Sequence, residues 1–334
     1  MKYIIPSVRI VPGNHCCFSS LRNIMLHHNV RISEADIYFL CDGLNVRYRS
    51  GFDFTWDSYN RETQLNFAQN CGLDVHECFN SDKETACFDM YDLVCNQHII
   101  MLFTDSQYLD YHAVYRENPG RGHIIILYGM DIDNQTAYVG DSFLLDAGGN
   151  ILSYQGPASY ERLCRGISSR TWFDFIENKP VSKENIVLEA IKNIESFSKG
   201  NITVQKELCG ILAYRKYFEH FEHLAQVEDA RFKEVCSEIY YSLRIGTIMN
   251  LIEYMGQFVL ETADFYQKDS SRIADKISNL HLGWKRNMFN VYKMGVRKNK
   301  NSVGSIISKS QSLIDLLETV LEDALTFLRL CVDS

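Results

Sequence analysis

The chain has 334 residues, of which 46% are hydrophobic and 23% are charged, values typical of a folded protein with a sizeable core and room for two domains. Its formal net charge is −8, which argues against nucleic acid as the main partner, because phosphate-binding surfaces are usually basic. No apolar run is long enough to span a membrane, and prolines interrupt the N-terminal segment before it could form a signal peptide. We therefore expect a cytoplasmic protein without a membrane span.

The cysteines follow no repeated Cys-x-x-Cys spacing, and their number, 11, is odd. This usage argues against both a disulfide framework and a zinc ribbon, and it is typical of reduced thiols. The group Cys71, His76 and Cys78 has irregular spacing and lacks a fourth ligand, so we expect no metal site there.

The first chemical signal lies in residues 13–25, with the sequence GNHCCFSSLRNIM. Apolar residues recur at helical spacing after Cys16, which predicts a helix that begins at this cysteine and runs to about His28. A thiol at a helix N-terminus is stabilised as a thiolate by the helix dipole and by unpaired N–H groups. Cys16 is therefore a candidate nucleophile. The alternative is a packed structural cysteine, and the adjacent Cys17 is a second candidate nucleophile.

A base and a carboxylate follow in residues 122–141. The run GHIIILYGMD predicts a buried strand with His123 at its start, and TAYVGD predicts the next strand, which ends on Asp141. A short turn between them predicts a hairpin that carries both side chains on adjacent strands. Together with Cys16 they form the Cys-His-Asp constellation of papain-like enzymes.

Other elements follow in chain order. A capping pattern at residues 33–36 predicts a second helix to about Cys41, and residues 46–56, which include Trp56, predict a strand or a lid over the site. Residues 99–103 predict a central strand, and the loop after it carries Asp105, Tyr108 and Tyr111. These side chains and Trp56 are candidate substrate contacts, and a structural role in fixing the loop is an equal alternative.

A change in composition divides the chain near residue 180. All 5 prolines lie in the first 180 residues, and the remainder shows helical periodicity almost throughout. We predict a catalytic domain over residues 1–175 and an all-helical domain over residues 180–334.

Two stretches then carry a resemblance to a known family. Residues 13–44, GNHCCFSSLRNIMLHHNVRISEADIYFLCDGL, and residues 123–143, HIIILYGMDIDNQTAYVGDSF, resemble the signature regions of the butirosin-biosynthesis H-type family of papain-like acyltransferases. They are similar, more distantly, to bacteriocin-processing papain-like peptidases. The resemblance covers roughly residues 8–170. It implies an α+β domain with an N-terminal helix packed on an antiparallel sheet, followed by the helical domain.

The same resemblance implies a function. Cys16 would be the nucleophile, His123 the base and Asp141 the carboxylate that orients it, with Asn14 or the backbone N–H of Cys16 or Cys17 as oxyanion donors. Family members transfer an acyl, aminoacyl or peptidyl group from a carrier-protein thioester to an amine in specialised-metabolite biosynthesis, of the aminoglycoside, peptide or polyketide type.

No cofactor is expected beyond the phosphopantetheine arm of the carrier protein. A thioesterase, a cyclase or a cysteine peptidase would use the same three residues, and a non-catalytic binding protein on this fold is a further alternative. The sequence leaves a homodimer open.

Overall fold

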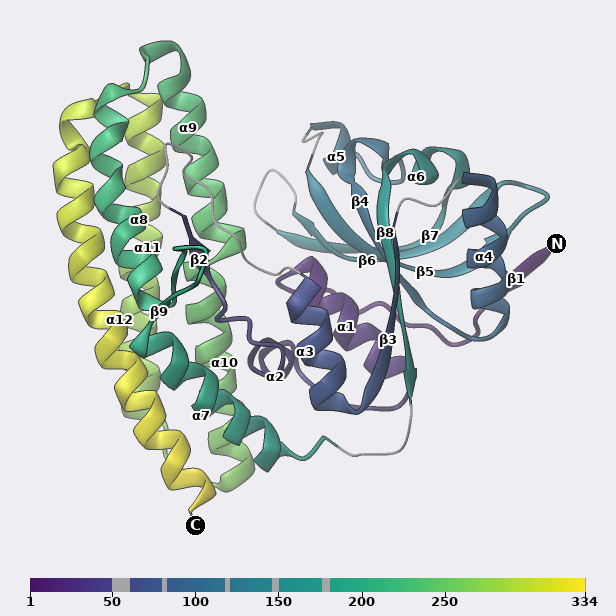
Figure 1. The fold of residues 1–334 in the computed structure, drawn as a ribbon, viewed down its shortest axis with the longest axis horizontal. Coiled ribbons are helices and arrows are strands. Elements are labelled where there is room, and N and C mark those ends of the chain that lie inside the picture. The colour runs from purple at the N-terminus through teal and green to yellow at the C-terminus, as the bar shows by residue number, and fades with distance from the viewer. Residues whose placement is uncertain (50–60, 80–82, 118–120, 146–149, 176–180, 334) are drawn as a thin grey trace. The chain divides into compact units, whose positions relative to one another are not determined.

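The structure, a computed structural model, describes the chain except residues 50–60, 80–82, 118–120, 146–149, 176–180 and 334 (Figure 1). The chain divides into two compact units, Met1–Ile37 with Phe67–Pro180 and Tyr38–Asn66 with Val181–Ser334. Among the helices of the described residues, none has the length and apolar character needed to cross a membrane.

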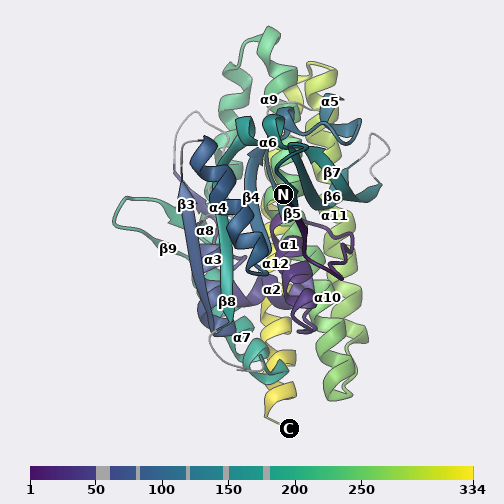
Figure 2. The ribbon, with the colours of Figure 1, turned by 90° about the vertical axis from the view of Figure 1, so that its right-hand side faces the viewer.

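The first unit is built on a seven-stranded sheet in which every strand pairing is antiparallel (Figures 1 and 2). The strand order is β3-β8-β4-β5-β6-β7, and β1 pairs with β5. The strands are β1 (Lys2–Ile4), β3 (Leu73–Phe79), β4 (Ile100–Asp105), β5 (Gly122–Asp131), β6 (Thr136–Leu145), β7 (Ile151–Ser159) and β8 (Ile167–Phe175).

The strand β5 lies inside this sheet between β4 and β6. Every residue of β5 after Gly122 is buried, which means that both faces of the strand are covered. The predicted hairpin is present: β5 and β6 pair antiparallel from Asp131↔Thr136 to Ile126↔Gly140, with an irregularity between Leu127 and Gly129. The chain reverses through Gln135, whose φ of 47° is in the left-handed region.

Helices cover the sheet of the first unit. The helix α1 packs on β5 and β6, whereas α4 packs on β1, β4 and β5. The capping pattern is also present, because the backbone N–H of Asp36 donates to Ser33 Oγ at 3.0 Å. The helices are α1 (Cys16–His27), α2 (Glu34–Leu40), α3 (Arg61–Cys71), α4 (Lys83–Cys95), η1 (Ser106–Tyr108), α5 (Val114–Glu117) and α6 (Tyr160–Gly166), and the division between the units falls within α2 and α3.

The second unit is a bundle of long helices that run side by side (Figures 1 and 2). Trp284 is fully buried in it, with its ring centroid 5.2 Å from that of Phe218. Its helices are α7 (Lys183–Lys199), α8 (Ile211–Glu219), η2 (His220–Gln226), α9 (Asp229–Tyr241), η3 (Ser242–Gly246), α10 (Ile248–Tyr266), α11 (Ser271–Val296), η4 (Lys300–Ser302) and α12 (Val303–Val332). A small sheet of β2 (Arg47–Tyr48), β10 (Leu208–Cys209) and β9 (Asn201–Ile202) accompanies them.

The predicted fold class is confirmed. An N-terminal helix packs on an antiparallel sheet, and a helical region follows in the sequence. Of the strand or lid predicted for residues 46–56, the described part contains only β2, and Trp56 lies outside the described residues.

Candidate active site

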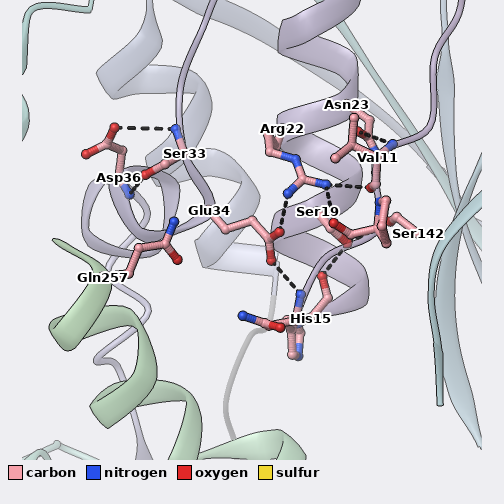
Figure 3. Close-up of polar contacts among 12 residues, drawn as sticks. Val11, His15, Ser19, Arg22, Asn23, Ser33, Glu34, Asp36, Ser142 and Gln257 are labelled. Carbon is pink, nitrogen blue, oxygen red and sulfur yellow. Dashed lines mark hydrogen bonds and ion pairs between the residues drawn. The ribbon is translucent and has the colours of Figure 1, made fainter. Parts of the chain in front are cut away.

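The loop before α1 is fixed by polar contacts that hold the start of the helix (Figure 3). The N–H of Gly13 donates to the carbonyl of Ser142 on β6 at 2.8 Å, and the N–H of Asn14 donates to Glu34 Oε2 at 2.9 Å. Arg22 of α1 pairs with the same Glu34 carboxylate. The loop is therefore tied to β6, α1 and α2 at once.

His15 caps α1. Its backbone is extended, with φ −151° and ψ 132°, and its Nδ1 accepts a hydrogen bond from the N–H of Cys17 at 3.2 Å. Ser19 Oγ donates to the His15 carbonyl at 2.6 Å. Burial, together with the nearby charge of His123, lowers the pKa of His15 to about 3, so this ring is uncharged at neutral pH and can act as an acceptor.

Cys16 is the first residue of α1 and is partly exposed, whereas Cys17 is 2% exposed. Burial, and to a lesser degree the neighbouring Cys16, raises the pKa of the Cys17 thiol well above its ordinary value. A thiol that stays protonated in the core is a poor nucleophile. Of the two adjacent cysteines, Cys16 has the surroundings that suit a reactive thiol.

His123 and Asp141 meet as the hairpin predicts. Nε2 of His123 lies 3.0 Å from Asp141 Oδ1 and 3.1 Å from Oδ2. A side-chain hydrogen bond also joins His123 to Cys16. The imidazole thus bridges the thiol and the carboxylate, and the structure brings Cys16, His123 and Asp141 together.

The charges of this group depend on one another. Burial by itself lowers the pKa of His123, but the charge of Asp141 and hydrogen bonds with Asp141 and Cys16 outweigh it and raise the pKa to about 10. Burial by itself raises the pKa of Asp141, yet His123 and two tyrosine hydroxyls hold it below its usual value. At pH 7 the pair is therefore an imidazolium beside a carboxylate.

Asp141 is fully buried and has further partners. Tyr111 donates its hydroxyl to Oδ2 at 2.8 Å, and Tyr115 donates its own hydroxyl to the same oxygen. The N–H of Phe143 donates to Oδ1 at 3.1 Å. A buried carboxylate needs such donors, because an unpaired charge inside a protein is costly.

The other predicted site residues lie as follows. Asp105 accepts from the N–H of Gln107 at 3.0 Å and caps η1, and Tyr108 lies within η1 beside Gly166. The Asn14 side chain is exposed. The Tyr111 hydroxyl donates to the Asp141 carboxylate, and Trp56 is outside the described residues.

The cysteines of the chain are free thiols. Within the part of the chain that the structure describes, no cluster of three or more His, Cys, Asp or Glu side chains could hold a metal ion.

Sequence reasoning missed several residues of this site. Tyr115 was one of them, and its signal is the four-residue spacing from Tyr111, which places both hydroxyls on one target when a short helix begins between them. Glu34, Arg22 and Ser142 were also missed. Their contacts join segments far apart in the sequence, so no local pattern could indicate them.

Comparison with known proteins gives a family match for the N-terminal part of the chain. No curated protein matches the sequence. Residues 15–142 match the family model described as butirosin biosynthesis protein H, N-terminal. The match begins beside Cys16 and ends just after Asp141, so it spans all three residues of the group. This match supports the predicted family, the butirosin biosynthesis protein H N-terminal family, over residues 15–142 of the chain.

Proposed function

We propose that this protein is a cysteine-dependent acyltransferase of specialised-metabolite biosynthesis, in which Cys16, His123 and Asp141 carry the chemistry. The observation that carries the proposal is the bridging position of His123. Its Nε2 lies 3.0 Å from the buried Asp141 carboxylate, and the ring also hydrogen-bonds to Cys16 at the start of α1. A nucleophile, a base and an orienting group in contact are what covalent acyl transfer requires.

In the first half of the reaction, the Cys16 thiolate attacks the carbonyl carbon of an acyl thioester. A tetrahedral oxyanion forms and then collapses, so that the bond to the leaving sulfur breaks and a new thioester joins the acyl group to Cys16. The His123 imidazolium gives its proton to the departing thiolate.

In the second half, an amine attacks the acyl-enzyme. Neutral His123 accepts a proton from the attacking nitrogen, the bond from the acyl carbon to Cys16 Sγ breaks, and an amide leaves. Water in place of the amine would give hydrolysis by the same steps.

The oxyanion needs hydrogen-bond donors near Cys16. The N–H of Cys17 donates to His15 Nδ1, which leaves the N–H of Cys16 as the nearest backbone donor in this proposal. The exposed Asn14 side chain is the second candidate donor, and its backbone is fixed by Glu34.

The family match supports the substrate class, since it connects this domain with a protein of butirosin biosynthesis. We propose that the donor is an acyl, aminoacyl or peptidyl group on the phosphopantetheine arm of a carrier protein, and that the acceptor is a small-molecule amine. The protein needs no further cofactor for this chemistry.

The first test of the proposal is intact-protein mass spectrometry after incubation with a panel of acyl-phosphopantetheine thioesters. The wild type should gain the mass of one acyl group. The variant Cys16→Ala should gain none, and its turnover should fall by roughly 10³-fold or more. Cys17→Ala is the matched control and should acylate like the wild type, because its thiol is buried.

Addition of amines then separates transfer from hydrolysis, since an amide product supports the acyltransferase and free acid alone would identify a thioesterase. A Cys16 that neither acylates nor alkylates faster than an ordinary thiol would contradict the catalytic proposal and favour a binding protein.

A further inference from the structure

Two tyrosines donate hydrogen bonds to the Asp141 carboxylate. Tyr111 lies in the loop after η1 and Tyr115 in α5, and both donate to Oδ2, the first at 2.8 Å. The other oxygen, Oδ1, receives His123 Nε2 at 3.0 Å and the N–H of Phe143 at 3.1 Å. Both oxygens are thus fixed, and the carboxylate has one orientation relative to the imidazole.

The tyrosine rings are themselves held in place. Tyr111 stacks on Tyr154 of β7, with ring centroids 4.5 Å apart and planes 14° apart. Tyr115 meets Tyr111 edge-on at 5.5 Å and lies 5.6 Å from the His123 ring. Burial and the charge of Asp141 raise the pKa of both tyrosines above the ordinary value, so both hydroxyls stay protonated and act as donors.

We propose that Tyr111 and Tyr115 are positioning residues that act through Asp141, rather than substrate contacts, and that they set the pH range in which Cys16 is reactive. This inference rests on the proposed function. The phenol pair fixes the carboxylate against His123 and supplies two O–H dipoles to a site that must carry net negative charge when Cys16 is a thiolate.

The direction of the effect follows from electrostatics. Each hydroxyl points its hydrogen, the positive end of the O–H dipole, at Asp141. The two dipoles stabilise the deprotonated state of Cys16, His123 and Asp141 taken together. Removal of a hydroxyl should therefore shift the titration of these three residues toward higher pH. The titratable groups that face this site are Cys16, His15, His123 and the two tyrosines themselves.

The experiment measures the alkylation rate of Cys16 by iodoacetamide against pH, with mass spectrometry to identify the modified residue. We compare the full-length wild type with Tyr115→Phe, Tyr111→Phe and the double variant. The midpoint of the rate profile should rise by about half a pH unit or more in each single variant, which is about a threefold lower rate below the midpoint. The double variant should shift further.

Tyr128→Phe is the matched control. Tyr128 is a buried tyrosine of β5 whose hydroxyl bonds to Gln155 and not to Asp141, so its removal should leave the profile in place. Melting temperatures of all variants report folding separately. If Tyr115→Phe does not fold, Tyr111→Phe carries the test, because its ring keeps the stacking on Tyr154.

The outcomes separate the two proposals. A reactive wild-type Cys16 with shifted profiles in the phenylalanine variants supports the positioning role. A reactive wild type with unshifted profiles would overturn this inference and leave the proposed function intact. A wild-type Cys16 as sluggish as an ordinary thiol would overturn both. If Tyr111→Phe changed the KM for the acyl donor without a shift in the pH profile of alkylation, Tyr111 would be a substrate contact and the inference would be wrong.

Discussion

His15 combines a structural contact with a titratable ring. Its Nδ1 accepts from the N–H of Cys17 while the ring is buried beside His123, and the pKa of His15 falls to about 3. The folded protein therefore keeps His15 neutral between about pH 3 and pH 6.5, whereas the unfolded chain takes up a proton in this range. The stability should fall as the pH is lowered through this window.

The variant His15→Asn removes this titration and keeps a helix cap, because an asparagine side chain can accept from the same backbone N–H groups. Between pH 7 and pH 5, the wild type should lose about 2 kcal/mol more unfolding free energy than the variant. Urea unfolding of both proteins at the two pH values measures the difference. Equal losses would mean that His15 is charged in the folded state.

At the scale of elements, the loop before α1 depends on a glycine. A Cβ on Gly13 would overlap the Glu34 carboxylate and the Cβ of Ser19. Glu34 would have to move, although it pairs with Arg22 and accepts from the N–H of Asn14. The close approach of α2 to this loop is thus possible only without a side chain at position 13.

Gly13→Ala should therefore cost about 1–3 kcal/mol in unfolding free energy and slow the alkylation of Cys16, because the start of α1 shifts. Gly304→Ala is the matched control: no described atom lies within 4 Å of its added Cβ, and it lies in α12, so it should stabilise the helix by up to about 1 kcal/mol. Chemical denaturation and thiol kinetics measure both. A Gly13→Ala protein with wild-type stability and reactivity would contradict this account of the loop.

The hairpin of β5 and β6 shows how far local pattern reaches at this scale. Apolar and β-branched residues with a short turn predict the two strands, and the structure has both. The tyrosines that donate to Asp141, Tyr111 and Tyr115, come from another segment of the chain. The sequence placed Tyr111 in a loop after a strand, and this position is the reason why it was a candidate substrate contact. Periodicity predicts the element that carries a side chain, but it does not predict which side chains from other segments contact it.

At the scale of the whole molecule, one segment that precedes the proline-free region, Tyr38–Asn66, belongs to the helical unit. Tyr38 lies 5.0 Å from Tyr254 and Phe39 lies 4.6 Å from Phe258, measured between ring centroids. Asn193 Nδ2 donates to the Phe39 carbonyl at 2.7 Å. The compact units divide between Pro180 and Val181, near the composition boundary, but Tyr38–Asn66 also lies in the second unit, which the composition does not indicate.

A fragment of residues 1–180 should consequently fail to form a soluble monomer. It would expose Tyr38, Phe39 and Tyr48, each at most 1% exposed in the full chain, and contiguous apolar surface of this kind promotes aggregation. Size-exclusion chromatography and thermal melts of the fragment and of the full chain test this. A monomeric fragment with a cooperative melt would contradict the prediction. If the prediction holds, serine substitutions at the three positions should improve the solubility of the fragment.

Local signals in the sequence were sufficient for the helix and the two strands that carry the three proposed catalytic side chains. Helical spacing after Cys16, the apolar run after His123 and the turn before Asp141 all depend on neighbours in the chain, so a linear pattern records them. The family resemblance rests on the same stretches and is supported by the family match over residues 15–142.

Only the tertiary structure decided the surroundings of these side chains. The burial of Cys17, the tie from Glu34 to the loop, the tyrosines on Asp141 and the packing of residues 38–48 on the helices join segments separated by many residues. Such contacts arise when the elements pack, because packing depends on three-dimensional complementarity and not on spacing along the chain. The charge and the orientation of the side chains at the site follow from that packing.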